Sequence, residues 1–183
     1  MYNGDCSYRR FLSGDDGAFD DIMREYFDGL VFFVNRYVND LHAAEDIAID
    51  VFSYVLVHKT RYNFKVSLKT YLFMLGKSRA LNYIKHRNRI KMVSLCETHG
   101  NDADYDALAG TVLADERKRA VSAALDTLSP DMREAVHLVY FEELSYSEAA
   151  RVMKKTHKQI DNLLYRAKGC LRTVLGREGE LLL

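Results

Sequence analysis

The sequence of 183 residues contains little of several residue types, and each shortage narrows the kind of protein it encodes. One proline, no tryptophan and little alternation of apolar and polar residues argue against a β-sheet protein. The three cysteines are odd in number and far apart, which excludes a disulfide framework and favours a reducing cytosol. No apolar run approaches the roughly 20 residues that span a bilayer, and the stretch MYNGDCSYRR lacks the apolar core of a signal peptide. We therefore expect a cytoplasmic, all-α protein.

Net charge is also missing, but the charged residues are unevenly distributed. Lys and Arg total 26, and Asp and Glu total 26. Residues 77–91 contain six Lys or Arg and no acid, whereas residues 92–116 contain six acids and no Lys or Arg. Residues 151–172 contain seven Lys or Arg and one Asp. The neutral total thus hides two basic segments separated by an acidic one.

Helical periodicity predicts the organisation of the chain. Apolar residues at helical spacing predict helices over 18–38, 42–58 and 68–88, with a loop at TRYNFKVS (60–67). Residues 94–114 are acidic, lose the pattern and predict a flexible linker. Helical periodicity returns after this linker. We therefore predict an N-terminal helical domain over 1–93 and a C-terminal one over 115–183, which contains a helix-turn-helix.

The helix-turn-helix is predicted from two helix starts. SYSE (145–148) and THKQ (156–159) both fit the capping-box pattern, and they begin eleven residues apart. Two helices joined by a turn of about three residues have the form of a helix-turn-helix. Ala149 and Ala150 are small, as a close helix crossing requires. The turn KKT has no glycine, and a lysine in the left-handed conformation costs roughly 1 kcal/mol or more, which favours an irregular turn. A further helix start is predicted at Ser129 and Pro130.

The second helix of this motif carries an apolar stripe and a polar face. The stripe contains Ile160, Leu163, Leu164, Ala167 and Leu171. Asparagine and arginine side chains on the other face can pair with adenine and guanine edges in the major groove, and lysines can hold phosphates. The alternative is an ordinary solvated surface helix. The capping boxes, the short turn and the two small alanines favour DNA binding over it.

The basic segment 77–91 suits single-stranded nucleic acid, because amide and aromatic groups lie among its cations. Leu81 and Ile84 are expected to face inward. Tyr62, Phe64 and Tyr71 can add rings from the preceding loop and helix. Again, the alternative is a solvated charged face.

The predicted helix over 42–58 is acidic where the next one is basic. Residues 37–58 contain Asp40, Glu45, Asp46 and Asp50 and no Lys or Arg. Asp46 and Asp50 are four residues apart and therefore share a face. Such a face gives either solubility alone or a surface for a basic partner.

Four segments, in this order along the chain, resemble bacterial sigma factors of the sigma-70 family, extracytoplasmic-function (ECF) type. They are GAFDDIMREYF, AAEDIAIDVF, SLKTYLFMLGKSRALNYIKHRNR and ALDTLSPDMREAVHLVYFEELSYSEAARVMKKTHKQIDNLLYRAKGCLRTVL. The likeness covers about residues 15–92 and 114–175. It implies a transcription initiation factor without enzymatic activity, cofactor or metal. The implied partners are core RNA polymerase, contacted at the clamp helices of its largest subunit and at its flap region, promoter DNA, and an anti-sigma factor at the inner face of the membrane. The free chain is expected to be a monomer.

The resemblance also assigns roles to residues. The polymerase-binding residues would be Glu45, Asp46, Asp50 and Phe52. The residues that recognise and melt the minus-ten element would be Tyr62, Asn63, Phe64, Lys77, Ser78, Arg79, Asn82, Lys85 and Arg87. The residues at the minus-thirty-five element would be Lys155, Thr156, His157, Lys158, Asp161, Asn162, Tyr165 and Arg166. The linker would pass near the RNA exit path of the polymerase.

Four positions depart from the family pattern. Ile49 stands where the family usually has Gln, and Tyr71 replaces a common Trp. Ser78 stands where an Asn often helps to hold a flipped-out base, and Asn82 replaces a frequent Asp. We therefore expect altered docking contacts and an altered minus-ten preference.

Two other functions fit single features of the sequence. One is a helix-turn-helix regulator that acts without stable polymerase association, which would need a dimer to cover two half-sites. The other is a metal protein or enzyme, because CETH (96–99) has the spacing of half a zinc site. No matching second pair, nucleophile-and-base arrangement or phosphate loop accompanies it.

Overall fold

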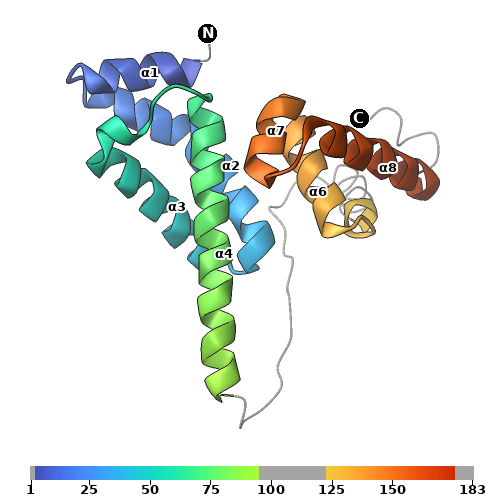
Figure 1. The fold of residues 1–183 in the computed structure, drawn as a ribbon. Helices are drawn as coiled ribbons and strands as arrows, with labels where there is room; N and C mark the ends of the chain where they lie inside the picture. The colour runs from blue at the N-terminus through green and yellow to red at the C-terminus, as the bar shows by residue number, and fades with distance from the viewer. Residues whose placement is uncertain (1–2, 95–122, 176–183) are drawn as a thin grey trace, which may run out of the picture. The chain divides into compact units, whose positions relative to one another are not determined.

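The structure, a computed structural model, describes residues 3–94 and 123–175 (Figure 1). The chain divides into two compact units, Met1–Ala103 and Asp104–Leu183. Within the described ranges all regular structure is helical and there is no strand, which confirms the predicted fold class. The division falls inside the predicted linker, of which residues 95–114 lie outside the described ranges. The predicted domain limits therefore stay predictions.

The first unit consists of α1 (Asn3–Leu12), α2 (Gly17–Val38), α3 (Leu41–Val57), the short 3₁₀ helix η1 (Lys59–Arg61) and α4 (Leu68–Ser94). Helix α2 packs against both α3 and α4, and α1 packs against α2 and α4. Gly76 allows the close approach of α4 to α2, because a Cβ there would lie 2.7 Å from Leu30 Cδ1. The three predicted helices are confirmed, although α4 continues six residues beyond its predicted end at residue 88.

One helix of this unit was not predicted, and one expectation about the unit is wrong. The sequence did not predict α1, because this helix is only ten residues long and mostly polar. Two rings, those of Tyr8 and Phe11, are fully buried and fix it to the unit. Leu81 was expected to face inward, but it is 48% exposed, because the outer face of α4 begins at Met74 and continues through Leu81.

The second unit contains α6 (Pro130–Val136), the π-helical turn η2 (His137–Phe141), α7 (Tyr146–Met153) and α8 (His157–Leu175). Helix α8 packs against α6 and α7. Ser129 is the N-cap of α6 and Pro130 opens it, as predicted. The buried core combines small and large residues: Ala135, Leu138, Ala149, Val152, Ile160, Leu164, Ala167 and Leu171.

Candidate nucleic-acid and polymerase interfaces

Both capping boxes of the helix-turn-helix are formed, so the predicted starts of α7 and α8 are confirmed. The Ser145 hydroxyl accepts a hydrogen bond from Glu148 N, and the Glu148 carboxylate accepts one from Ser145 N at 3.0 Å. Thr156 Oγ1 accepts from Gln159 N at 3.2 Å, and Gln159 Oε1 accepts from Thr156 N at 2.8 Å. Each box satisfies two backbone N–H groups that a helix start would otherwise leave unpaired.

The turn between α7 and α8 is regular, contrary to the expectation drawn from its lack of glycine. Lys154 adopts the left-handed conformation, with φ 55° and ψ 43°. Lys155 N donates to the Ala150 carbonyl at 2.9 Å, which is the bond that spans six residues in a Schellman turn. The left-handed conformation of Lys154 costs free energy, but it lets the turn close with hydrogen bonds. The closed turn fixes the angle between the two helices.

Helix α8 places the predicted base-reading residues on its exposed side. Ile160, Leu164, Ala167 and Leu171 are buried, as predicted for the apolar stripe. The exposed residues are His157, Lys158, Asp161, Asn162, Tyr165 and Arg166, and Tyr165 is 81% exposed. Donors and acceptors for base edges and one cation for phosphates thus lie together on one rigid helix.

Two candidate residues at the start of α8 make contacts within the fold. Lys155 Nζ lies 2.9 Å from Asp131 Oδ2 in α6, and the Thr156 side chain caps α8. Both therefore position α8, the helix that carries the predicted base-reading residues. The capping box predicted the Thr156 cap, but the sequence gave no local signal of the Lys155 pair, because Asp131 is 24 residues away.

Sequence reasoning missed an aromatic group beside the recognition helix. The Tyr146 ring lies 5.6 Å from the His157 ring, between the starts of α7 and α8. Lys168 Nζ lies 5.3 Å from the centre of the Tyr140 ring, and a hydrogen bond with Tyr140 raises the pKa of Lys168. Lys168 is exposed on α8, so its ammonium is available for a phosphate contact.

The six candidate residues of α4 fall into two groups. Arg79, Arg87 and Lys77 turn toward neighbouring helices. Arg79 lies 3.4 Å from Asp50, and Arg87 donates to the Val38 carbonyl at 3.0 Å. The Lys77 ammonium lies 5.8 Å from the centre of the Tyr37 ring.

Ser78, Asn82 and Lys85 form the second group, which is exposed at helical spacing on the outer face of α4. Leu81, at 48% exposure, lies on the same face. Amide, hydroxyl, apolar and cationic groups are therefore available on this surface, whereas most of the arginine side chains hold the helix in place.

The loop before α4 brings some predicted residues to the surface and buries one. Asn63 is exposed, its Oδ1 accepts from Lys65 N at 3.1 Å, and Phe64 is half-buried with φ 59°. Tyr62 is only 3% exposed, so its ring does not face solvent as a base-stacking residue would. Its burial raises the pKa of the hydroxyl, and the hydrogen bond to Asp5 raises it further.

Helix α3 presents an outer face that is acidic and partly apolar. Asp46 and Asp50 are exposed, and Glu45 is half-buried with its carboxylate 3.7 Å from His42. Phe52 does not belong to this face, because it is 2% exposed and packs on other rings in the core.

Sequence reasoning missed the apolar part of this face. Leu41, Ile49, Leu56 and Val57 are between 42% and 73% exposed. The available signal was the nearly continuous apolar composition of α3, which exceeds what one buried stripe needs.

Two absences apply to the described ranges. No three or more His, Cys, Asp or Glu side chains there gather as a metal site would require, and Cys96 and His99 lie outside those ranges. None of the helices in residues 3–94 and 123–175 is both long and apolar enough to cross a membrane.

Comparison with known proteins matches each unit to a different region of one family. Residues 22–90 match sigma-70 region 2, and residues 118–171 match sigma-70, region 4. The ECF RNA polymerase sigma factor SigM of Bacillus subtilis (strain 168) is 25% identical over 159 residues, which are 86% of this chain and 95% of SigM. The RNA polymerase sigma-H factor of Pseudomonas aeruginosa is 25% identical over 178 residues, which are 91% of this chain and 90% of that protein.

Solved structures share the fold. The sigma factor RpoE from Bartonella quintana, solved in complex with the anti-sigma factor NepR, aligns with a TM-score of 0.67 at 23% identity. That alignment covers 87% of this chain and 97% of RpoE. CnrH, solved in complex with the cytosolic domain of CnrY, aligns with a TM-score of 0.63 at 16% identity and covers 93% of this chain and 95% of CnrH.

The fold and the exposed basic helix-turn-helix define a two-unit helical DNA-binding protein of the transcription machinery. With regions 2 and 4 both matched, and in that order, the chain belongs to the sigma-70 family, as a factor of the extracytoplasmic-function type. It is accordingly a promoter-specific initiation factor that acts with RNA polymerase, and no observation favours a regulator that acts without polymerase.

Proposed function

We propose that the two units divide promoter recognition between duplex reading and strand opening. In the second unit, α8 enters the major groove of the minus-thirty-five element. Asn162 and Arg166 contact base edges, Lys158 and Lys168 contact phosphates, and the Lys155–Asp131 pair and the Thr156 cap keep α8 in register. The single observation that carries this proposal is the exposure of all six outward candidates on a helix whose opposite stripe is buried.

The first unit opens and holds the minus-ten element in this proposal. The exposed outer face of α4, with Ser78, Asn82 and Lys85, follows the separated strand, and Asn63 and Phe64 receive an unpaired base. Extruding a base costs a few kcal/mol, and stacking returns about 1–3 kcal/mol per base. The cost of extrusion and the gain from stacking nearly balance, so contacts with the polymerase supply the remaining free energy of strand opening. The free chain should therefore bind promoters weakly.

Polymerase docking is assigned to the outer face of α3 and to the second unit. Asp46 and Asp50 meet a basic surface on the clamp helices of the largest subunit, and Ile49 adds apolar contact between them. The ion pair with Arg79 offsets the negative charge of Asp50 only partly, because the Asp50 side chain remains 72% exposed. The second unit contacts the flap region.

We further propose that the factor acts in the cytoplasm as a monomer and is held inactive by an anti-sigma factor. The complexes of the two solved neighbours with NepR and with the cytosolic domain of CnrY support this proposal. An anti-sigma factor that covers the outer face of α3 would exclude polymerase from the same surface.

Run-off transcription with purified core polymerase on a genomic library tests the function. We expect the factor to co-elute with core polymerase and to produce transcripts from a limited set of start sites. The DNA upstream of these start sites should share two sequence elements, each at a fixed distance from the start site. Core polymerase alone is the control. A properly folded chain that neither co-elutes nor changes the set of transcripts would overturn the proposal, and specific duplex binding without polymerase would favour the regulator.

A further inference from the structure

Helix α1 ties both ends of the loop 62–67 with a single carboxylate. Asp5 Oδ1 accepts a hydrogen bond from Leu68 N at 2.9 Å, at the start of α4. The same oxygen lies 2.6 Å from the Tyr62 hydroxyl, which also lies 2.7 Å from the Val66 carbonyl oxygen. Asp5 is 57 residues from Tyr62 and 63 from Leu68, so this is a long-range cap rather than a local helix start.

The same helix supports the strained residue of the loop. Phe64 has φ 59°, a conformation that costs free energy for a residue with a side chain. The Arg9 guanidinium lies 4.3 Å from the centre of the Phe64 ring, and the Tyr62 ring centre lies 4.6 Å from it. Such strain persists where surrounding contacts over-determine it, and two of these contacts depend on α1.

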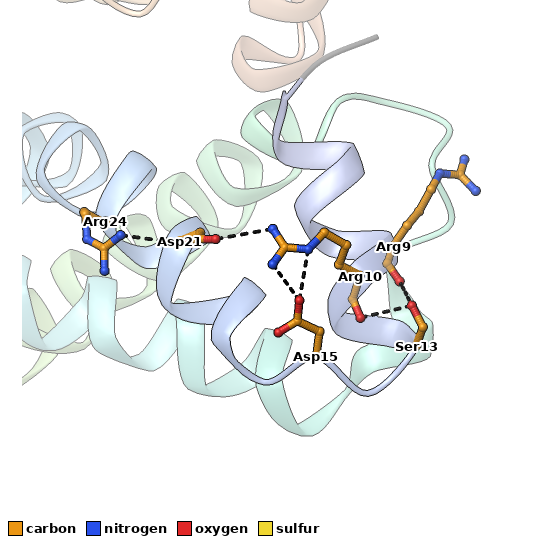
Figure 2. A network of polar contacts seen from close by, with 6 residues as sticks. All are labelled: Arg9, Arg10, Ser13, Asp15, Asp21 and Arg24. Carbon is orange, nitrogen blue, oxygen red and sulfur yellow. Dashed lines mark hydrogen bonds and ion pairs between the residues drawn. The ribbon is translucent and has the colours of Figure 1, made fainter.

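Helix α1 is itself firmly held. The Tyr8 hydroxyl donates to the Lys59 carbonyl at 2.8 Å, and the Tyr8 ring is fully buried. At the other end, the Arg10 guanidinium donates twice to Asp15 Oδ2, at 2.9 and 2.6 Å, and reaches Asp21 at 3.5 Å (Figure 2). The Arg9 side chain points away from this network (Figure 2). The turn between α1 and α2 is therefore closed on one side while Arg9 remains available to the loop.

We propose that α1 is a positioning element for strand opening, which holds residues 62–67 in the conformation that receives the unpaired minus-ten base. Asp5 and Tyr62 are its positioning residues, and Asn63 and Phe64 are the residues they present. This assigns Tyr62 a role different from the base contact expected from the sequence. The inference rests on the proposed function of the loop, and the competing explanation is that α1 only stabilises the first unit.

The test uses four single substitutions in the full-length factor, assembled with core polymerase. Asp5→Ala removes the shared acceptor, and Asp5→Asn keeps an oxygen in its place. Tyr62→Phe removes one hydroxyl and leaves the ring. Asp21→Ala is the matched control, because it removes only the longest contact of Arg10, at 3.5 Å, and the pair with Arg24. The two bonds from Arg10 to Asp15, which hold the end of α1, and every contact of the loop stay in place. The promoter is one selected by run-off transcription with the unaltered factor, with a fluorescent base analogue in its minus-ten element.

Three quantities are measured: helical content, affinity for core polymerase and the equilibrium extent of strand opening. Asp5→Ala should reduce the opening constant about tenfold, in line with loss of hydrogen bonds to a charged group, and leave polymerase affinity unchanged. Asp5→Asn should restore most of the opening. Asp21→Ala should match the unaltered factor. A purely stabilising role would lower polymerase affinity and opening together, and Asp5→Asn would then restore both together.

The inference is overturned if Asp5→Ala opens the promoter as well as Asp21→Ala does, or if opening and polymerase affinity fall in proportion. If Asp5→Ala loses helical content, Tyr62→Phe decides, because a severalfold loss of opening at normal polymerase affinity is expected for it as well. Failure of the unaltered factor to open any promoter would instead overturn the proposed function, and the inference with it.

Discussion

Replacing Lys154 with glycine should stabilise the helix-turn-helix. Lys154 has φ 55° and closes the turn while its side chain is exposed. A residue with a Cβ loses about 1–2 kcal/mol in the left-handed region, and glycine does not. The greater freedom of glycine in the unfolded chain takes back roughly 0.5–1 kcal/mol. The expected net gain for Lys154→Gly is therefore about 0.5–1 kcal/mol.

Lys154→Ala isolates the backbone contribution, because both substitutions remove the ammonium group and only glycine relieves the strain. The assay is native-state hydrogen exchange of the buried amides of α8 in the full-length chain, which reports opening of this motif. A gain of this size corresponds to about two- to fivefold slower exchange in the glycine variant than in the alanine variant. Equal exchange in the two variants would refute the claim that strain is stored at this turn.

Three further predictions concern binding and pH. Asn162→Ala combined with Arg166→Ala should remove about 1–3 kcal/mol of discrimination per base contact at the minus-thirty-five element, measured by competition between promoter duplexes, at normal polymerase affinity. Asp46→Arg combined with Asp50→Arg should weaken polymerase binding without loss of helical content, because an exposed ion pair such as Asp50's contributes about 0–1 kcal/mol to folding. Burial of the Tyr8 ring raises the pKa of its hydroxyl to about 12 from 10.0, so the folded state keeps a proton that the unfolded state releases. The stability of the first unit should therefore fall as pH rises from 10.0 to about 12, and urea titrations of Tyr8→Phe should show a shallower fall.

Each of these predictions has its own control. Asp20→Arg combined with Asp28→Arg, on exposed positions of α2, changes the charge equally away from α3, and it should leave polymerase affinity nearly unchanged. Equal weakening by both charge reversals would mean that the α3 face has no specific role. For the recognition helix, a simultaneous loss of polymerase affinity would point to misfolding. For the pH effect, identical curves for both proteins would exclude Tyr8 as its source.

Patterns confined to a few neighbouring residues were sufficient to predict much of the structure of this protein. The helix-turn-helix follows from two capping boxes and an apolar stripe. Each capping box is complete within about one helical turn, and the stripe within about three. The outward positions of Asn162, Tyr165 and Arg166 follow from the same periodicity. The acidic face of α3 is determined in the same way, because Asp46 and Asp50 are separated by one turn.

Other features depended on contacts between residues far apart in the chain. Tyr62 and Phe52 carry aromatic rings, which are common at interfaces, yet both rings are buried. Whether a ring faces solvent depends on which helix covers it. Leu81 is exposed for the converse reason, since no helix within residues 3–94 covers that side of α4.

The sequence by itself determined the longer helices, the N-caps of α6, α7 and α8, and the face of α8 that carries polar groups, because each is encoded within a few successive residues. Only the tertiary structure decided that α1 exists as a packed helix, that Asp5 caps α4, and that the buried Tyr62 contacts Asp5 and the Val66 carbonyl within its own loop. A carboxylate that bonds to groups 57 and 63 residues away leaves no periodic trace in the sequence, and only the packed helices bring those atoms within hydrogen-bonding distance.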